Sequence, residues 1–258
     1  MTTTTLAPRS PLHLTLLHAR FQFLETVRVP IAVIGNLLFP TLAMFFFVVP
    51  QPEVSQNPGI ATAAAAQLAT FAIISTCLFS FGAGVAEDRA MPFDPYLRTL
   101  PAGAAPRLAG RVVNGIVWCL LALVPLIAIA VVFTEATITP QRLLLALACV
   151  PVVALPFLLL GLAIGYALSN KAAIAVVQAV LFPLAFAGGL FMPPEVFPGW
   201  MNAISRALPT RAARDLVIDV ATGYPAYALA LPVLVGWTVL FAVLAVTAYR
   251  RDEGRRFR

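Results

Sequence analysis

Six long apolar stretches, separated by short polar joints, occupy most of this chain. Each stretch is close to the ~20 residues that an α-helix needs to cross ~30 Å of hydrocarbon. Because hydrocarbon supplies no water to peptide groups, each stretch must satisfy its hydrogen bonds internally, and none shows the period-two alternation of a membrane β-strand. The sequence therefore predicts an all-α membrane protein with six transmembrane helices, over residues 29–50, 60–86, 112–133, 143–168, 172–192 and 227–249.

The composition agrees with lipid as the solvent. Hydrophobic residues make up 60% of the 258 residues and charged residues 11%, with a mean hydropathy of +0.91. A soluble domain would carry roughly 25% charged residues. The composition excludes a soluble domain, and no nucleic-acid interface is indicated because no basic face is interleaved with aromatic residues.

Positive residues set the expected orientation, because they are retained on the cytoplasmic side of a membrane. An even number of spans places both termini on one side. If that side is the cytoplasm, positive residues favour it by about three to one. The richness in arginine and alanine suggests a high-GC bacterial genome, so we expect a multi-pass protein of the bacterial plasma (inner) membrane. The outer group is Arg142, Arg206, Arg211 and Arg214, and the inner group is Arg9, Arg20, Arg28, Arg89, Arg98, Arg107, Arg111, Lys171, Arg250, Arg251, Arg255, Arg256 and Arg258.

Three regions follow from this pattern. We expect a cytoplasmic tail and an interfacial helix over residues 1–28, a transmembrane domain over 29–249, and a basic cytoplasmic tail over 250–258. The N-terminal region is expected to form a helix in the inner membrane interface, because apolar residues recur there every three or four positions between polar ones. These apolar residues are Leu12, Leu16, Ala19, Phe23 and Val27.

Two joints differ from the rest. The cytoplasmic joint 87–111 is rich in charge and proline, and Pro95 can begin a short helix over residues 96–100 that Pro101 ends. The outer joint 193–222 alternates short apolar pieces with proline. Its segments 196–208 and 211–220 predict short helices that are re-entrant or interfacial, and Trp200 suits an outer interface because its ring is amphipathic.

The order of these segments resembles a known family. An interfacial helix and two spans are followed by a cytoplasmic joint containing LRTLP, four further spans and an outer P-x-x-x-P-G-W segment, with another proline at Pro209. This arrangement resembles the permease subunit of type-2 ATP-binding-cassette (ABC-2) exporters, and the resemblance covers nearly the whole chain. It implies a partnership with two cytoplasmic ABC ATPase subunits and with a second permease, identical or homologous.

The resemblance also implies roles for particular residues. In that family the joint after the second span docks into a cleft of the ATPase, although Pro92 and Pro95 depart from the usual pattern of this joint. The implied ATPase-coupling residues are Glu87, Asp88, Arg89, Tyr96, Leu97, Arg98, Leu100 and Pro101. The implied outer gate consists of Phe191, Met192, Pro193, Pro194 and Trp200.

The single lysine of the chain bears on whether the chain itself can bind and hydrolyse ATP. A phosphate-binding loop needs the spacing G-x-x-x-x-G-K-[ST], in which the lysine contacts the terminal phosphates. Lys171 follows Ser169 and Asn170 and has no such glycine run before it. We therefore expect no catalytic residue, metal or cofactor in this chain, and expect the partner ATPase to bind ATP and Mg.

Polar side chains within the spans indicate surfaces that avoid lipid. Asn36, Gln67, Ser75, Thr76, Asn114 and Gln178 are such residues. The second and fifth spans line the path in the resembled family, which makes Gln67, Ser75, Thr76 and Gln178 candidates for the translocation path. Hydrogen bonding between helices is the alternative role for each. Because the first and third stretches carry no charge, a hydrophobic or amphiphilic cargo (a drug, lipid or glycoconjugate) is expected rather than an ion.

Glycine, proline and cysteine residues inside the stretches have expected roles in packing and helix bending. Gly161 and Gly165 have the small-xxx-small spacing that lets helices approach closely. Prolines inside the stretches permit kinks, either hinges or static bends. These are Pro40, Pro125, Pro151, Pro156 and Pro183. The cysteines are expected to be packing residues, because they form no paired motif. They are Cys77, Cys119 and Cys149.

Two other function classes remain open from the residues. An intramembrane enzyme that modifies lipids or prenyl groups would need paired carboxylates for a metal and a diphosphate. The close acidic pairs, 87–88 and 252–253, lack the spacing for such a site. A secondary transporter would show an internal repeat or a charged midplane site, and neither is found in the sequence.

Overall fold

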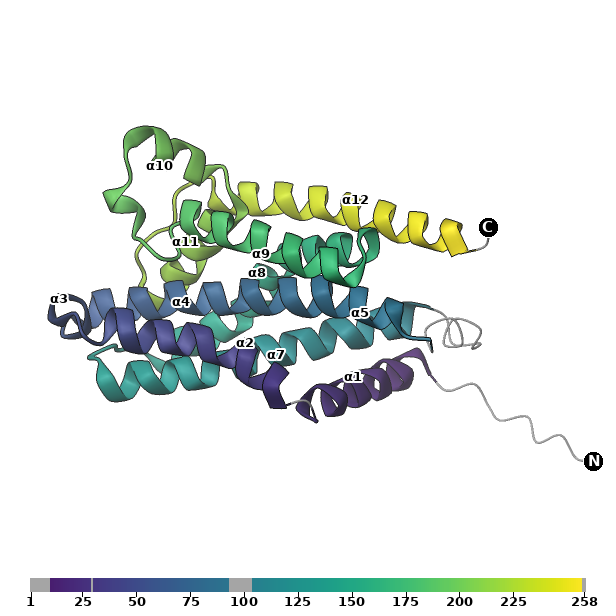
Figure 1. Cartoon of the computed structure of the whole chain (residues 1–258). Helices are drawn as coiled ribbons and strands as arrows, with labels where there is room; N and C mark the ends of the chain where they lie inside the picture. Colours follow the sequence, from purple (N-terminus) through teal and green to yellow (C-terminus); the bar gives the residue numbers. More distant parts are fainter. Residues whose placement is uncertain (1–9, 29, 93–103, 257–258) are drawn as a thin grey trace, which may run out of the picture.

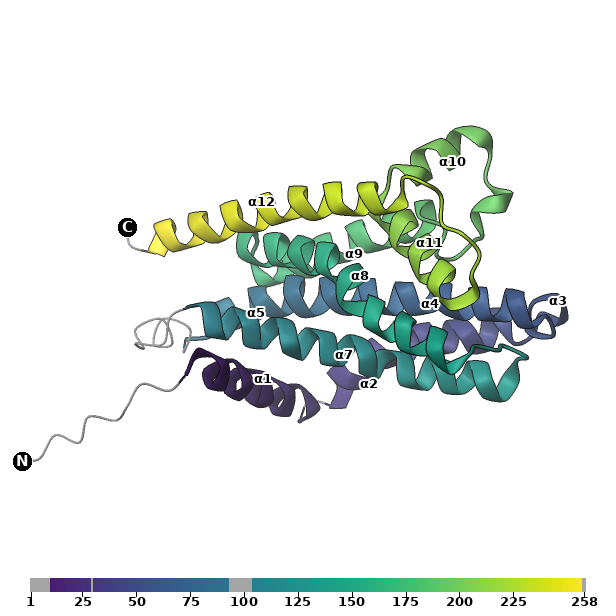
Figure 2. The same cartoon turned by 180° about the vertical axis from the view of Figure 1, so that it is seen from behind.

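The computed structural model describes residues 10–28, 30–92 and 104–256, and within these residues it is built from helices without strands. The long helices run side by side as an elongated bundle (Figure 1, Figure 2). The beginning of α1, α5 and the end of α12 lie at one end of the bundle, which we call the α5 end, and α3 and α10 lie at the other, the α10 end. The helices are α1 (Pro11–Val27), α2 (Pro30–Ala43), η1 (Met44–Val48), α3 (Pro52–Ser55), α4 (Pro58–Leu78), η2 (Phe79–Ala83), α5 (Gly84–Ala90), α7 (Ala104–Phe133), α8 (Pro140–Ala167), α9 (Asn170–Ala187), η3 (Pro194–Val196), α10 (Gly199–Arg206), α11 (Pro209–Thr222) and α12 (Ala230–Arg256).

Five helices in the described part of the chain are long and apolar enough to cross a membrane. They confirm five of the predicted stretches as helices of spanning length. The first stretch, 29–50, is occupied by α2 and the π-helix η1, which follow one another directly, and its described side chains form the apolar helix Leu37–Val48. The five helices are Pro58–Ala90, Pro106–Phe133, Pro140–Ala167, Asn170–Ala187 and Ala230–Asp252.

Capping residues followed by proline fix where two of these helices begin. The Asn57 side-chain oxygen accepts hydrogen bonds from the backbone N–H groups of Gly59 at 3.1 Å and Ile60 at 3.2 Å. The Thr139 hydroxyl accepts from the backbone N–H of Arg142 at 3.4 Å. In both cases the next residue is proline, which has no N–H to leave unsatisfied in the first turn. α4 and α8 therefore begin sharply at the α10 end.

The interior of the bundle is centred on α4 and η2, which pack against α7, α8 and α11. Gly161 and Gly165 allow α8 to approach η2 closely, as their spacing predicts. A Cβ atom on Gly165 would lie 2.5 Å from the carbonyl oxygen of Phe81, and one on Gly161 would lie 2.9 Å from the Phe81 Cβ. Only glycine fits at these contacts without displacing the backbone of η2.

α1 packs against the first part of α7. Gly110 forms the closest approach, because a Cβ atom there would lie 2.7 Å from the Cβ of His18. The rings of Phe23 and Trp118 stack at a centroid distance of 5.4 Å. Leu12 and Leu16, expected at the membrane interface, are exposed on the face of α1 that does not contact α7. The N-terminal helix thus has one packed face and one open apolar face.

The outer joint forms three short helices, η3, α10 and α11, rather than the two segments expected. α10 is exposed at several apolar positions, including Trp200 and Ile204. α11 differs from the amphipathic surface helix that its arginines suggested, because its residues are buried nearly all round, against α4, α8 and α12. The reason is that its charged side chains pair within the protein, as described below.

The cysteines are free, in agreement with a packing role. Cys77 and Cys119 are buried, and their sulfur atoms lie 3.7 Å apart, a contact distance rather than a bond. The five intramembrane prolines all lie inside helices, so their missing N–H groups interrupt the helical hydrogen bonds without ending the helix. They are Pro40 in α2, Pro125 in α7, Pro151 and Pro156 in α8, and Pro183 in α9.

Candidate translocation path and coupling face

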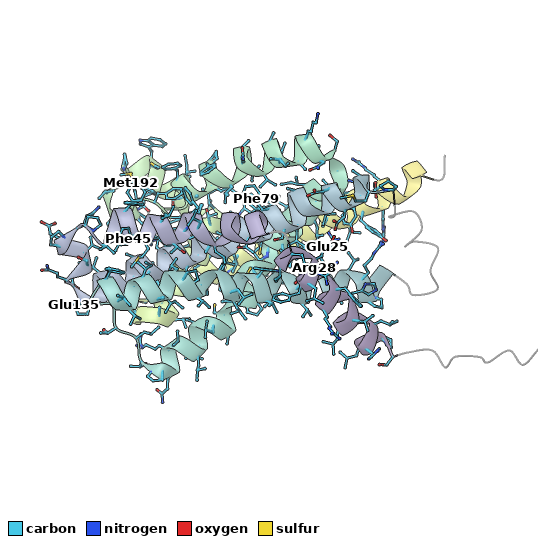
Figure 3. All side chains as sticks on the ribbon, turned by 60° about the horizontal axis from the view of Figure 1, so that its bottom comes forward. Glu25, Arg28, Phe45, Phe79, Glu135 and Met192 are labelled. Atoms are coloured by element: carbon cyan, nitrogen blue, oxygen red, sulfur yellow. The ribbon has the colours of Figure 1, made fainter. Side chains whose placement is uncertain are left out.

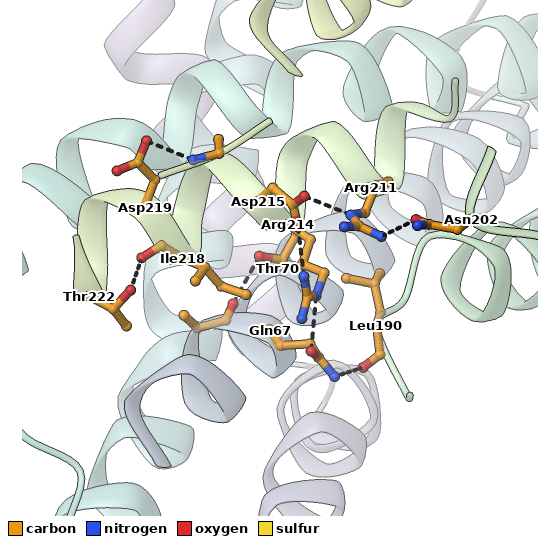
Figure 4. Close-up of polar contacts among 12 residues, drawn as sticks. Gln67, Thr70, Leu190, Asn202, Arg211, Arg214, Asp215, Ile218, Asp219 and Thr222 are labelled. Carbon is orange, nitrogen blue, oxygen red and sulfur yellow. Dashed lines mark hydrogen bonds and ion pairs between the residues drawn. The ribbon is translucent and has the colours of Figure 1, made fainter. Parts of the chain in front are cut away.

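Near the α10 end, α11 brings two arginines and an aspartate into the protein interior beside α4 (Figure 4). Arg211, Arg214 and Asp215 are each less than 9% exposed, at 8%, 7% and 8%. A charge can be buried at this depth only when it is paired and hydrogen-bonded. We call this group, with its partners Gln67 and Asn202, the α11 polar cluster.

Asp215 is the centre of the cluster. One of its oxygens accepts from Nε of Arg211 at 2.6 Å, and the other accepts from NH1 of Arg214, also at 2.6 Å. Arg211 reaches the side-chain oxygen of Asn202, at 3.5 Å, with its NH1 group. Two guanidinium groups share one carboxylate, so the cluster carries a net positive charge.

Gln67, a predicted path residue, connects this cluster to two other segments. Its side-chain oxygen accepts from Nε of Arg214 at 3.0 Å, and its Nε2 donates to the carbonyl oxygen of Leu190 at 3.1 Å (Figure 4). Both ends of the amide are therefore engaged inside the protein. The contacts tie α4, α11 and the segment after α9 together at one point.

The other predicted path residues have different surroundings. The Ser75 hydroxyl donates to the carbonyl oxygen of Ala72 at 3.1 Å, within its own helix. The Thr76 hydroxyl is buried and has no hydrogen-bond partner among the described residues. Gln178 is exposed on α9. No hydrogen bond joins any two of these four described side chains.

The predicted gate residues fall into two groups. Phe191 lies in an aromatic cluster, with ring centroids 5.0 Å from Phe71, 4.8 Å from Phe186 and 6.5 Å from Phe39. Pro194 is buried against Gly189. The φ angle of Gly189 is +77°, a backbone conformation that glycine adopts with little steric penalty.

The remaining gate residues are exposed. Met192 is 52% exposed and Trp200 69% exposed, and Pro193 is exposed as well. Figure 3 shows Met192 toward the same end of the molecule as Glu135, away from Glu25 and Arg28 of α1. Only Phe191 and Pro194 of the five predicted gate residues therefore belong to the packed interior.

At the α5 end, Arg89 makes the most contacts of the predicted coupling residues that the structure describes. Its NH1 group donates to the carbonyl oxygens of Gly165 at 2.5 Å and Leu168 at 3.1 Å, at the end of α8. Its NH2 group forms an ion pair with Asp252 of α12, which is buried. The guanidinium also lies over the Tyr166 ring, 5.7 Å from its centroid. Arg89 thus joins α5 to the ends of α8 and α12.

Asp88 and Glu87 lie nearer the surface. Asp88 forms an ion pair with Arg111 of α7 and is 49% exposed at its side chain. Glu87 is exposed. The remaining predicted coupling residues lie outside the described residues: Tyr96, Leu97, Arg98, Leu100 and Pro101.

Four interior acidic and basic side chains were not predicted from the sequence. The sequence predicts Arg211 and Arg214 in the outer joint, within the short helix expected over 211–220, and gives Asp215 no role. The spacing of Arg211 and Asp215, four residues apart on one helix, is the signal that could have indicated an ion pair. From the sequence, Asp252 is part of the basic tail and of the acidic pair 252–253, and its partner Arg89 is 163 positions away, so their ion pair is not indicated there.

Comparison with known proteins agrees with the resemblance. A family model described as "ABC-2 type transporter" matches residues 14–221. The putative transport permease YvfS of Bacillus subtilis (strain 168) is 23% identical over 222 residues, covering 86% of this chain and 91% of that protein. The daunorubicin resistance ABC transporter permease protein DrrB1 of Streptomyces coeruleorubidus is 38% identical over 78 residues, covering 29% of this chain and 27% of that protein. The chain belongs to the ABC-2 type transporter family, as a membrane permease.

Proposed function

We propose that this chain is the permease subunit of an ABC exporter and forms the translocation path for a hydrophobic or amphiphilic compound such as a drug, a lipid or a glycoconjugate. A separate ATPase subunit binds ATP and Mg and supplies the energy. The observation that carries the cargo class is the 38% identity, over 78 residues, with a permease named for daunorubicin resistance. The uncharged apolar stretches noted above favour the same class of cargo over an ion.

The proposed topology has six spans, with α2 and η1 together as the first. Both termini and the α5 end lie in the cytoplasm of a bacterial cell, and α10 lies outside. The arginine distribution supports this orientation.

A second permease, identical or homologous, is proposed to pack against α9. Four residues spaced four apart form an exposed stripe along this helix, and one of them is the amide Gln178. An amide that faces lipid is costly, whereas one that faces a partner helix or a watery path is satisfied. The stripe consists of Ile174, Gln178, Phe182 and Phe186.

Coupling to two ATPase subunits is proposed to use the joint 87–111. Its residues Tyr96, Leu97, Arg98, Leu100 and Pro101 dock into the ATPases, by resemblance to the family. Arg89 supports a route from this joint into the membrane domain, because it contacts the ends of both α8 and α12. A displacement of α5 would therefore move two further helices.

Release on the outer side is proposed to involve the aromatic cluster around Phe191. The cluster joins α2, α4 and α9 near the α10 end, through Phe39, Phe71 and Phe186. The neighbouring residue Leu190 accepts the hydrogen bond from Gln67. A displacement of α4 would therefore be transmitted through this hydrogen bond to the segment that carries the gate residues.

The test is daunorubicin accumulation in a sensitive bacterial strain. Cells that express the permease together with its ATPase are expected to retain less daunorubicin than cells that express the permease with an ATPase lacking its phosphate-binding lysine. Equal retention, with both subunits present in the membrane fraction, would reject daunorubicin-like compounds as cargo.

A further inference from the structure

A cavity of about 390 Å³ opens between the ends of α8 and α12, at the α5 end of the molecule. This volume falls within the roughly 300–1,000 Å³ typical of small-molecule sites. Lining residues recur every three or four positions, so each helix contributes one continuous stripe. The stripes include Leu160, Ile164 and Ala167 on α8, and Leu244, Ala248 and Arg251 on α12.

The cavity is apolar along its length and basic at one end. From Leu244 to Arg251 the α12 stripe rises about 10 Å, at 1.5 Å per residue. Small side chains at Ala167 and Ala248 leave the space between the two helices unfilled. An apolar chain fits along the walls, and its polar end would lie at Arg251.

Charge at the mouth of the cavity is positive on balance. Asp252 also lines the cavity, but it is paired with Arg89. Arg251 is exposed and forms no ion pair with any described residue. The guanidinium that is free to receive a ligand is therefore that of Arg251, beside a carboxylate that is already neutralised.

The depth of Arg251 in the membrane matches a lipid head group. No charged residue interrupts α12 from Ala230 to Tyr249, and Arg250 and Arg251 follow directly. An arginine at this point extends toward the head groups, while the residues before it remain in hydrocarbon. Basic pockets between helices at this level bind anionic lipid head groups.

We propose that the groove between α8 and α12 binds one anionic phospholipid of the cytoplasmic leaflet, with its phosphate on Arg251 and an acyl chain along the two stripes. The choice of leaflet rests on the proposed topology, in which the α5 end is cytoplasmic. The binding itself requires only that α8 and α12 span the membrane. The lipid is treated as distinct from the cargo, because none of the residues lining the groove is a predicted path or gate residue.

Native mass spectrometry of the purified full chain tests this proposal. The protein is equilibrated in nanodiscs with equal amounts of dioleoylphosphatidylglycerol and dioleoylphosphatidylcholine, and the lipids retained after release are counted. Retention of the phosphatidylglycerol is expected to fall about fivefold in Arg251→Gln, the factor expected for one basic residue at an anionic surface. The matched variant Arg250→Gln, on the neighbouring exposed arginine, is expected to retain it normally.

A second pair of variants tests the groove itself. Thr247→Trp fills the cavity and is expected to remove the bound lipid, whereas Val246→Trp, on an adjacent exposed position outside the cavity, is expected to keep it. Equal losses in Arg251→Gln and Arg250→Gln would mean general attraction to the basic tail and would overturn the proposal. Preferential disulfide-linked dimers of Thr247→Cys would also overturn it, since a second copy would then occupy the groove. None of these measurements depends on transport, so they separate this proposal from the proposed function.

Discussion

Arg89 and Asp252 form an ion pair between the end of α5 and the end of α12, with side-chain exposures of 16% and 4%. Arg89 also donates to two carbonyl groups at the end of α8. Three helices therefore meet at one guanidinium. Since α5 leads into the joint that is proposed to contact the ATPases, this pair connects the start of that joint to the end of α12.

Removing one member of this pair is expected to be strongly destabilising. Asp252→Ala leaves the Arg89 charge partly buried without its carboxylate, and such a change costs about 3–5 kcal/mol of unfolding free energy. Asp88→Ala is the matched control, because the exposed pair of Asp88 with Arg111 contributes about 0–1 kcal/mol. Denaturant unfolding in detergent measures both. Equal losses in the two variants would contradict the special position of Asp252.

The α11 polar cluster is expected to depend on Asp215 in the same way. Asp215→Asn leaves the guanidinium groups of Arg211 and Arg214 buried without a counter-charge, for a loss of about 3–5 kcal/mol in unfolding free energy. Asp219→Asn, on the same helix, affects one hydrogen bond from the backbone N–H of Ala226 and is expected to cost about 1 kcal/mol. If Asp215→Asn unfolded with the same free energy as the parent protein, the two arginines would have other partners, and the central role of Asp215 would be contradicted.

Close packing of α8 on η2 is expected to make Gly165 intolerant of a methyl group. In Gly165→Ala the new Cβ would lie 2.5 Å from the carbonyl oxygen of Phe81, so the helices must separate. Gly236→Ala in α12 places its Cβ in open space and is expected to gain up to about 1 kcal/mol in helix propensity. Thermal unfolding distinguishes the two, with a fall in Tm for Gly165→Ala and none for Gly236→Ala. A tolerated Gly165→Ala would contradict the close contact.

The packing of α1 is expected to weaken in acid. Burial, and secondarily the charge of Arg107, lower the pKa of His18 below its ordinary value of 6.5. The unfolded state then binds the proton more readily than the folded state, so protonation favours unfolding. The contribution is full above pH 6.5 and falls as the pH drops from there through the lowered pKa of the folded state. His18→Gln should reduce the loss of unfolding free energy between pH 8 and pH 5, and His13→Gln, at an exposed position of the same helix, is the matched control.

Coupling is expected to require Arg98. Arg98→Glu reverses the charge at the proposed docking segment and should reduce transport-coupled ATP hydrolysis in the reconstituted complex, while Tm stays unchanged. Arg250→Glu, a charge reversal elsewhere at the α5 end, serves as the control. Normal turnover in Arg98→Glu would reject the coupling role of this residue.

Hydropathy predicted most of the fold, because every span in lipid must be an apolar helix that satisfies its own backbone hydrogen bonds. Five of the predicted stretches are helices of spanning length, and the close contact at Gly165 follows from the small-xxx-small spacing. The first stretch is helical through α2 and η1, and its place as a sixth span stays a prediction.

The polar interior could not be predicted in the same way. Arg214 is 147 positions from Gln67, and its charge is tolerated in the interior only because Gln67 and Asp215 receive its hydrogen bonds. A sequence pattern that places arginine on a short helix predicts a surface position, since burial of an unpaired charge is costly. The error thus arose from partners that only the tertiary structure brings together.

The most direct test of the account is transport by the purified permease in sealed liposomes, with and without its ATPase. The account predicts that the permease moves daunorubicin against its gradient only when the ATPase, ATP and Mg are present on the side of the membrane that the α5 end faces. Uphill transport by the permease alone would contradict it.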